Sequence, residues 1–260
     1  MKTALITGAS YGIGATFARE LAARKTDVIL VARSEDKLQQ LATELENREG
    51  IKAEAIVQDL TEAAAGTKLF ETVKQKELRV DLLINNAGFG DYGTFADREL
   101  HRQLDMVQLN IKVLVELTYL FLKEMRERGS GSIINVSSIA GFQPMPYISV
   151  YAASKAFVLN FTEGLRAENK DTGVRIQALC PGPTESNFFE NASFPRSVVA
   201  SSSQNYASSE EVVRESLDAL EKDISNVVAG GFANQVIVNL HRFFPRNVLI
   251  SMVEKQFKNV

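Results

Sequence analysis

The stretch TALITGASYGIG, residues 3–14, runs from an apolar segment into a loop with three glycines. TALIT (3–7) is typical of a buried β-strand, and Gly8, Gly12 and Gly14 follow where a strand would turn into a helix. Glycines at such a turn let the backbone approach a pyrophosphate at the helix N-terminus. The spacing is G-x-x-x-G-x-G rather than the commoner G-x-G-x-x-G, so the loop alone leaves an ordinary strand–helix turn open.

Similar apolar runs alternate with helical patterns along the chain. Their successive Val, Ile and Leu residues are typical of parallel strands buried on both faces. The runs are TALIT (3–7), DVILVA (27–32), AEAIVQ (53–58), DLLIN (81–85), SIINVS (132–137), VRIQALC (174–180) and VVAG (227–230). Helices are expected at 16–24, 35–47, 62–77, 99–128, 151–170 and 210–225. The alternation predicts an α/β, doubly wound Rossmann fold, with a parallel sheet of about seven strands and helices on both faces.

No linker, repeat or change of composition divides residues 1–180, and we expect one dinucleotide-binding and catalytic domain over 1–260. Residues 184–226 begin with many Ser, Asn and Phe and are expected to form a substrate loop and lid. Residues 232–260 are amphipathic, are interrupted by Pro245, and are expected to form a C-terminal helical extension.

Composition narrows the functional classes. The net charge of −3 gives no reason to expect nucleic acid or anionic lipid as a partner. Cys180 is the sole cysteine, which excludes an internal disulfide framework, and with His101 and His241 far apart no metal site is expected. The longest uncharged run, 129–154, is rich in Ser and Gly, unlike a membrane span. We therefore expect a cytoplasmic protein.

The C-terminal region leaves one alternative open. Phe243 and Phe244 lie between Arg242 and Arg246, a pattern that permits peripheral membrane contact.

The residue after the second strand bears on the choice of cofactor. An NAD site usually has Asp or Glu there to accept from the ribose 2′-hydroxyl, but this chain has Arg33. A guanidinium can form a forked, charge-assisted pair with a 2′-phosphate. Arg33 therefore predicts NADP(H), while a solvated surface arginine and NAD(H), favoured by nearby Glu35, stay open.

The segment SVYAASKAF, 149–157, places Tyr151 one helical turn before Lys155 with only small residues between them. A phenol with a pKa of about 10 is a poor base at neutral pH, and a neighbouring ammonium favours its phenolate. The pair predicts an acid–base group tuned by a cation, although Y-x-x-x-K alone also occurs on many solvated helices.

Taken in order, these motifs resemble the short-chain dehydrogenase/reductase family over nearly the whole chain. The motifs are TGASYGIG (7–14), Asp59-Leu60, NNAG (85–88), Asn110, NVSS (135–138), YAASK (151–155) and PGPT (181–184). The resemblance implies an NADP(H)-dependent oxidoreductase that moves hydride between the nicotinamide and a carbonyl or alcohol. An NAD(H)-dependent alcohol dehydrogenase and a catalytically silent sensor or scaffold stay open as alternatives.

The resemblance also implies four catalytic residues. Tyr151 would exchange the proton with the carbonyl oxygen, and Ser138 would hydrogen-bond that oxygen. Lys155 would lower the pKa of the tyrosine and bind the nicotinamide ribose. Asn110 would bend its helix and hold a water that relays protons to Lys155. Ser137 is an alternative to Ser138, which only its spacing to Tyr151 favours.

The cofactor contacts follow from the same resemblance. They are Gly8, Ser10, Tyr11, Gly12, Ile13, Gly14, Arg33, Asp59, Leu60, Asn86, Ala87, Gly88, Tyr151, Lys155, Pro181, Gly182 and Thr184. Many NADP-preferring relatives carry Arg or Lys where this chain has Tyr11, so Arg33 alone would supply the phosphate preference.

Residues that follow the strands favour an uncharged, apolar ketone or aldehyde as the small-molecule substrate, with ordinary loop packing as the alternative. They are Phe89, Tyr92, Ile139, Phe142, Gln143, Tyr147, Phe188 and Phe189, and Arg196 is the only Arg or Lys expected near them. By analogy with the family, helices 99–128 and 151–170 would pair in a homodimer or homotetramer.

Overall fold

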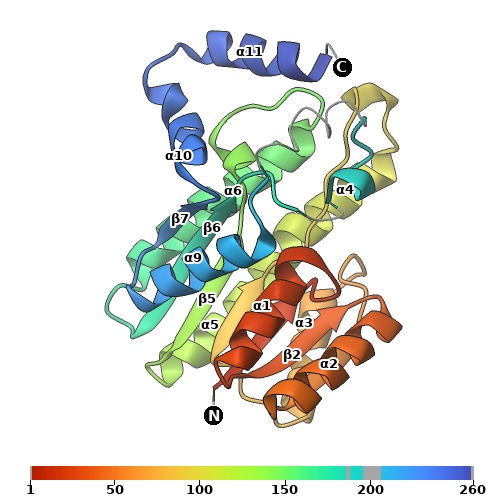
Figure 1. The fold of residues 1–260 in the computed structure, drawn as a ribbon, viewed down its shortest axis with the longest axis vertical. Helices are drawn as coiled ribbons and strands as arrows, with labels where there is room; N and C mark the ends of the chain where they lie inside the picture. Colours follow the sequence, from red (N-terminus) through yellow and green to blue (C-terminus); the bar gives the residue numbers. More distant parts are fainter. Residues whose placement is uncertain (1, 186–187, 196–205, 259–260) are drawn as a thin grey trace.

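The computed structural model describes residues 2–185, 188–195 and 206–258, and within them seven strands form one parallel sheet (Figure 1). The sheet order is β3-β2-β1-β4-β5-β6-β7. The strands are β1 (Thr3–Thr7), β2 (Asp27–Ala32), β3 (Ala53–Val57), β4 (Leu82–Asn85), β5 (Gly131–Val136), β6 (Val174–Pro181) and β7 (Asn226–Ala229). Each strand matches its predicted run to within one residue at either end, and the predicted fold class is confirmed.

Helices cover both faces of the sheet. One face carries α1 (Gly12–Ala23), α2 (Glu35–Glu49) and α9 (Ser209–Glu221), and the other carries α3 (Ala65–Gln75), α5 (Leu114–Glu127) and α6 (Ser149–Glu168). Successive strand residues enter different cores: Ile6 packs under the first layer and Leu5 under the second. This two-sided burial is why the strands are apolar at consecutive positions.

The single helix expected over 99–128 is divided. Helix α4 (Leu100–Val107) continues through a π-helical segment, η2 (Gln108–Val113), into α5. A π-helical turn is wider than an α-helical one, and such turns are frequent at functional sites. Asn110 lies in this wider turn and is buried.

After β6, the chain forms α9 and β7, and its other elements lie towards the carboxyl ends of the strands. A short helix, α7 (Phe188–Asn191), lies over the sheet's carboxyl edge; the expected Arg196, like the rest of 196–205, lies outside the described residues. The C-terminal arm, 232–258, consists of α10 (Phe232–Asn239), η5 (Leu240–Arg242) and α11 (Arg246–Lys258). None of the described helices is long and apolar enough to cross a membrane.

Candidate active site

A cavity of about 1130 Å³ lies at the carboxyl ends of the strands, by the point where strand order reverses between β1 and β4. Sheets of this topology bind ligands at that point. All but one of the seventeen expected cofactor residues line the cavity; the exception is Gly14. Three of the four expected catalytic residues also line it, while Asn110 lies behind the wall.

The glycine loop forms a cradle of bare backbone. Gly8 and Gly12 have φ angles of +68° and +54°, a region that favours glycine. A Cβ on Gly14 would lie 2.2 Å from the Gly8 carbonyl oxygen, so this position admits only glycine without a shift of the backbone. Asn86 Nδ2 donates to the Thr7 carbonyl at 2.9 Å and ties the cradle to the loop after β4. The cradle faces the cavity and fits a pyrophosphate.

The far end of the cavity carries two cations. The Arg33 side chain is 73% exposed, and its Nη1 lies 3.7 Å from Asp59 Oδ2. Burial opposes ionisation of Asp59, yet hydrogen bonds from Thr61 and the charge of Arg33 hold the pKa of that carboxyl below its usual value. Lys37, at the start of α2, lines the same end, with its Nζ 5.7 Å from the centroid of the Tyr11 ring. Arg33 is therefore not the sole cation at this end of the cavity. Lys37 lies four residues after Arg33, and this spacing could have predicted it as a second cation.

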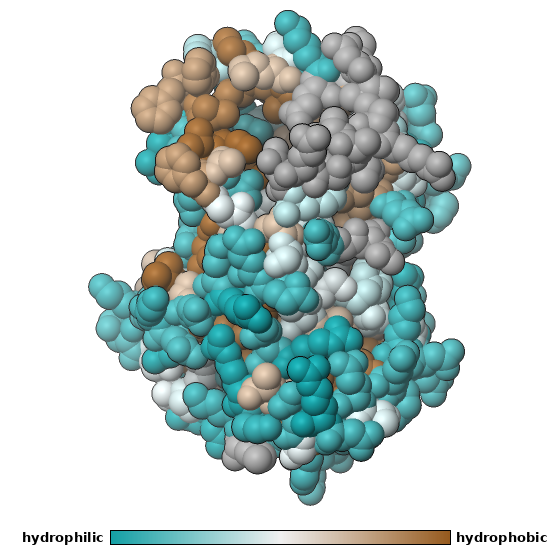
Figure 2. Space-filling model, viewed as in Figure 1, coloured by the Kyte–Doolittle hydropathy of each residue, from teal (hydrophilic) through white to brown (hydrophobic). Residues whose placement is uncertain are grey.

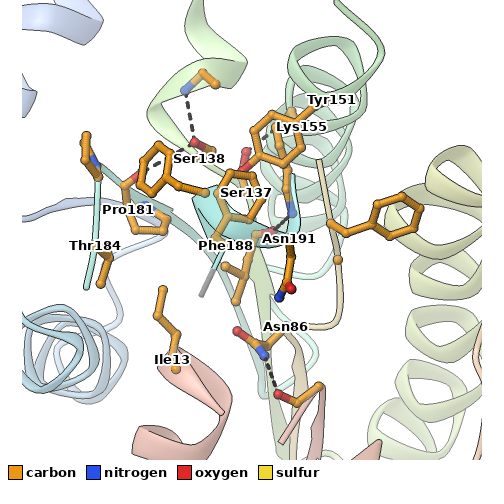
Figure 3. Close-up of a pocket in the computed structure, with 18 of the residues that line it drawn as sticks. Ile13, Asn86, Ser137, Ser138, Tyr151, Lys155, Pro181, Thr184, Phe188 and Asn191 are labelled. Atoms are coloured by element: carbon orange, nitrogen blue, oxygen red, sulfur yellow. Dashed lines mark hydrogen bonds between the residues drawn. The ribbon is translucent and has the colours of Figure 1, made fainter. Parts of the chain in front are cut away.

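Tyr151 and Lys155 extend from the first turns of α6 into the cavity (Figure 3). Lys155 Nζ donates to the Val136 carbonyl at 2.8 Å and lies 5.8 Å from the centroid of the Tyr151 ring. Burial lowers the pKa of Lys155 to about 8. Burial also raises the pKa of Tyr151 to about 12, although a hydrogen bond with Ser138 opposes this rise.

The net shift of the Tyr151 pKa is therefore upward, opposite to the lowering expected from Lys155. The phenolate would lose its hydration in this cavity, and this desolvation is the largest contribution to the rise in pKa. At neutral pH the phenol keeps its proton.

The two adjacent serines after β5 have different partners. Ser137 Oγ donates to the Lys155 carbonyl at 2.7 Å and so fastens α6 to the sheet. Ser138 Oγ accepts from the Ala140 backbone N–H at 3.1 Å and hydrogen-bonds Tyr151. Because Ser137 is occupied with the backbone of α6, the geometry favours Ser138 as the serine that meets a ligand.

Asn110 connects the loop after β4 to α6 from behind the cavity. Its Oδ1 accepts from the Phe89 N–H at 3.1 Å, and its Nδ2 donates to the Phe89 carbonyl and to Ser154 Oγ, both at 3.0 Å. A Cβ on Gly88 would lie 3.0 Å from Asn110 Oδ1 and 3.4 Å from Lys155 Nζ. Gly88 therefore keeps open the space between this amide and the lysine.

The substrate end differs in part from the expected set. Phe89, Ile139, Gln143, Phe188 and Phe189 line the cavity, and the Phe188 ring centroid lies 5.1 Å from that of Tyr151. The other three expected residues do not line it: Phe142 packs with the core below α6, and Tyr92 and Tyr147 pack against α11. The sequence analysis also missed apolar and aromatic residues of this lining, among them Met145, Ile148, Phe194, Tyr206, Val253 and Phe257.

A buried ion-pair cluster holds α7 over this end. The carboxylate of Asp91 is fully buried and accepts from Arg98 at 2.6 and 2.8 Å and from Arg102 at 2.8 Å. Burial opposes its ionisation, but these two guanidinium groups hold the pKa of Asp91 below its usual value. Arg102 also donates to the Asn191 carbonyl, at the end of α7, at 2.7 Å. The sequence analysis expected no Arg or Lys here besides Arg196; Arg102 is a second one, already paired.

Comparisons with known proteins agree with this geometry. The family model described as short chain dehydrogenase matches residues 2–195. Ketoacyl reductase HetN of Nostoc sp. is 40% identical over 181 residues, which cover 70% of this chain and 63% of that protein. The very-long-chain 3-oxoacyl-CoA reductase of Anas platyrhynchos is 38% identical over 186 residues, 68% of this chain and 58% of that protein. The chain thus spans less than two thirds of either relative's length.

A solved structure resembles the whole fold. It is a short-chain dehydrogenase from Sphingobium yanoikuyae in complex with NADPH, with a TM-score of 0.83 and 30% sequence identity over 96% of this chain and 95% of that one.

Proposed function

Since this chain belongs to the short-chain dehydrogenase/reductase family, we propose that it is an NADP(H)-dependent oxidoreductase that reduces an uncharged, apolar ketone or aldehyde. One observation carries the proposal: the Tyr151 phenol, the Ser138 hydroxyl and the Lys155 ammonium share a cavity with a glycine cradle (Figure 3).

The assignment of NADP(H) as the cofactor rests on the glycine cradle and on the two cations near it. The bare backbone around Gly8 and Gly12 would hold the pyrophosphate, and Arg33 with Lys37 would hold a 2′-phosphate. The Sphingobium yanoikuyae dehydrogenase, which resembles this chain throughout, binds NADPH. When bound, the nicotinamide supplies hydride to the carbonyl carbon.

Tyr151 would act as the proton donor. Its pKa of about 12 keeps the phenol protonated at neutral pH, which suits reduction. The Tyr151 hydroxyl would donate its proton to the carbonyl oxygen, and the Ser138 hydroxyl would donate a hydrogen bond to the same atom. Lys155, with a pKa of about 8, would be mostly charged at pH 7 and would stabilise the phenolate that remains.

The aromatic lining supports an apolar substrate. Phe188, Phe189 and Phe194 form linked ring contacts, with Phe188 next to Tyr151. The guanidinium of Arg102 on this wall already hydrogen-bonds Asp91 and the Asn191 carbonyl, so those donors are not available to a substrate. Both relatives are named for keto groups on acyl chains, which agrees with an apolar chain next to the reacting carbonyl.

The organisation of the chain is part of the proposal. Residues 1–260 would form one domain, with 184–226 as the substrate loop and lid and 232–260 as a helical extension. A homo-oligomer formed through α4, α5 and α6 is supported by apolar side chains exposed on these helices, among them Leu100, Leu104 and Phe157.

The proposed function is tested with NADPH and a panel of alkyl and aryl ketones, aldehydes, sugars and dicarboxylates. We expect turnover of the apolar carbonyls, and a fall in kcat of about 10²- to 10⁴-fold in Tyr151→Phe with NADPH affinity retained. Tyr119→Phe is the matched control, because that ring is 67% exposed on α5. Near-normal turnover in Tyr151→Phe, or faster reduction of charged sugars, would contradict the proposal.

A further inference from the structure

The C-terminal arm has apolar side chains that are buried against the body and others that are exposed. Its inner side buries Leu249, Val253 and Phe257, and the latter two pack against the aromatic cluster around Tyr92 and Tyr147. Tyr92 also donates to the Phe257 carbonyl at 2.8 Å, which fixes α11 to the body. These contacts of the inner side hold the arm against the body, and the exposed side chains take no part in them.

The outer side is exposed and apolar. Every residue from 242 to 248, RFFPRNV, is exposed, and Phe243 and Phe244 are 78% and 45% exposed. Val248 and Met252 continue the surface along α11 at 44% and 53% exposure. Figure 2 shows apolar surface gathered over the arm, while the lower part of the molecule is mostly hydrophilic. A contiguous apolar patch of this kind marks an interaction surface.

The arm also has a charge opposite to that of the rest of the chain. Residues 232–260 contain four basic residues and one acidic residue, a net charge of +3, so the remainder carries −6. Arg242 and Arg246 flank the two phenylalanines and are exposed, as is Lys255. The net charge of −3 for the whole chain gave no reason to expect an anionic lipid as a partner. The arm by itself is basic, so the local charge differs from the overall one.

The same arm forms one wall of the cavity. Phe232 and Ile237 of α10, together with Val253 and Phe257 of α11, line it. Phe232 is at the same time 83% exposed, so the apolar wall continues from the cavity to the outer surface. Apolar side chains of the arm are thus found both in the cavity wall and on the outer surface.

The charge pattern disfavours a second copy of the chain as the occupant. A twofold contact centred on the patch would bring Arg242 and Arg246 against the same residues of the other copy. Like charges at such an interface oppose association. An anionic lipid surface, in contrast, satisfies the arginines and the phenylalanines together.

We propose that the C-terminal arm docks on an anionic lipid surface, with Phe243 and Phe244 among the acyl chains and Arg242 and Arg246 at the headgroups. The arm would lie in the interface plane.

The test is sedimentation of the full chain, without cofactor or substrate, with vesicles of phosphatidylcholine with or without phosphatidylglycerol. We expect binding to the anionic vesicles that weakens as salt is raised. F243S/F244S should weaken it about tenfold or more, because two aromatic side chains no longer enter the lipid. R242Q/R246Q should weaken it about 30-fold, because each basic residue near an anionic surface contributes about 1 kcal/mol.

The matched control is Ile224→Ser, which removes a 47% exposed apolar residue that precedes β7, at the opposite end of the strands from the cavity. It should bind vesicles like the unmodified chain, and every variant should keep its circular dichroism and its NADPH affinity. Absence of binding by the unmodified chain, or equal binding by the arm variants, overturns the proposal. A fall in oligomer mass in F243S/F244S without vesicle binding also overturns it and assigns the surface to a second copy.

Discussion

The two ends of the cavity are built in different ways. The cofactor end consists of short loops that follow neighbouring parallel strands, and backbone forms much of its surface, as at Gly8 and Gly12. The substrate end consists of side chains from segments far apart in the chain, including Phe89, Tyr206 and Phe257. The first end depends on local conformation and the second on tertiary packing, so substitutions should affect them in separable ways.

The largest effect that would separate the two ends is expected for Arg33→Asp. The change removes the exposed guanidinium and introduces a repelling charge, so the preference for NADPH over NADH should fall about 100-fold. Steady-state KM and kcat for both cofactors measure it, and KM for the carbonyl should hardly change. Arg48→Asp, at the C-terminal end of α2, is the control, because its side chain is 70% exposed. An unchanged ratio would mean that Arg33 does not contact the phosphate.

Lys37→Ala, tested in the same way, should lower the preference less. Lys37 is further from the strand end, and Arg33 would remain in place.

This division also explains what could be predicted from sequence. The strands were located to within one residue because two-sided burial marks them by consecutive apolar residues, as in DVILVA (27–32). The cofactor-end residues were predictable because the carboxyl ends of adjacent parallel strands must meet at one edge. Ser138 follows β5 at this edge, and the first turns of α6 bring Tyr151 and Lys155 to the same cavity.

The substrate end was only partly predictable. Nothing in the local pattern around Phe257 indicates that α11 returns to the cavity, since the contact with Tyr92 spans 165 residues. Phe142 has the composition of a lining residue, but its neighbours turn it into the core with Leu159. Asp91 was missed because a lone aspartate in a loop gives no sign of burial until Arg98 and Arg102 fold onto it.

Lys155 lies where the two ends join, and its burial makes stability depend on pH. Its pKa is about 8 in the folded protein against an ordinary 10.5, so between these values the unfolded chain binds more protons. This group therefore makes the folded state more stable as pH rises through that window. The gain from about pH 7 to about pH 9.5 should be about 2 kcal/mol.

Urea unfolding of the cofactor-free chain measures that gain. Lys155→Met should lose it and be more stable than the unmodified chain at about pH 7, because a buried charge is removed. Lys123→Met, exposed on α5, should keep the pH dependence. Equal pH slopes in the unmodified chain and Lys155→Met would show that the lysine is not desolvated.

The smallest effect is expected for Arg102→Met, which tests whether α7 is positioned by the buried Asp91. Methionine retains apolar contact with Phe89, whose ring centroid lies 5.2 Å from the guanidinium, but loses the bonds to Asp91 and to the Asn191 carbonyl. Because Arg98 still pairs with Asp91, the fold should persist while α7 moves away from the cavity.

KM for an apolar carbonyl should therefore rise about three- to tenfold in Arg102→Met, with kcat and the affinity for NADPH little changed. Arg19→Met removes an ion pair with Glu44 that is exposed between α1 and α2, and it should leave KM unaltered. A matching rise in the KM for NADPH would show that both ends depend on the same cluster, and the separation between them would fail. A change confined to the carbonyl would place substrate affinity in the long-range packing of this end, since the guanidinium touches only α7, Asp91 and the Phe89 ring among the contacts described.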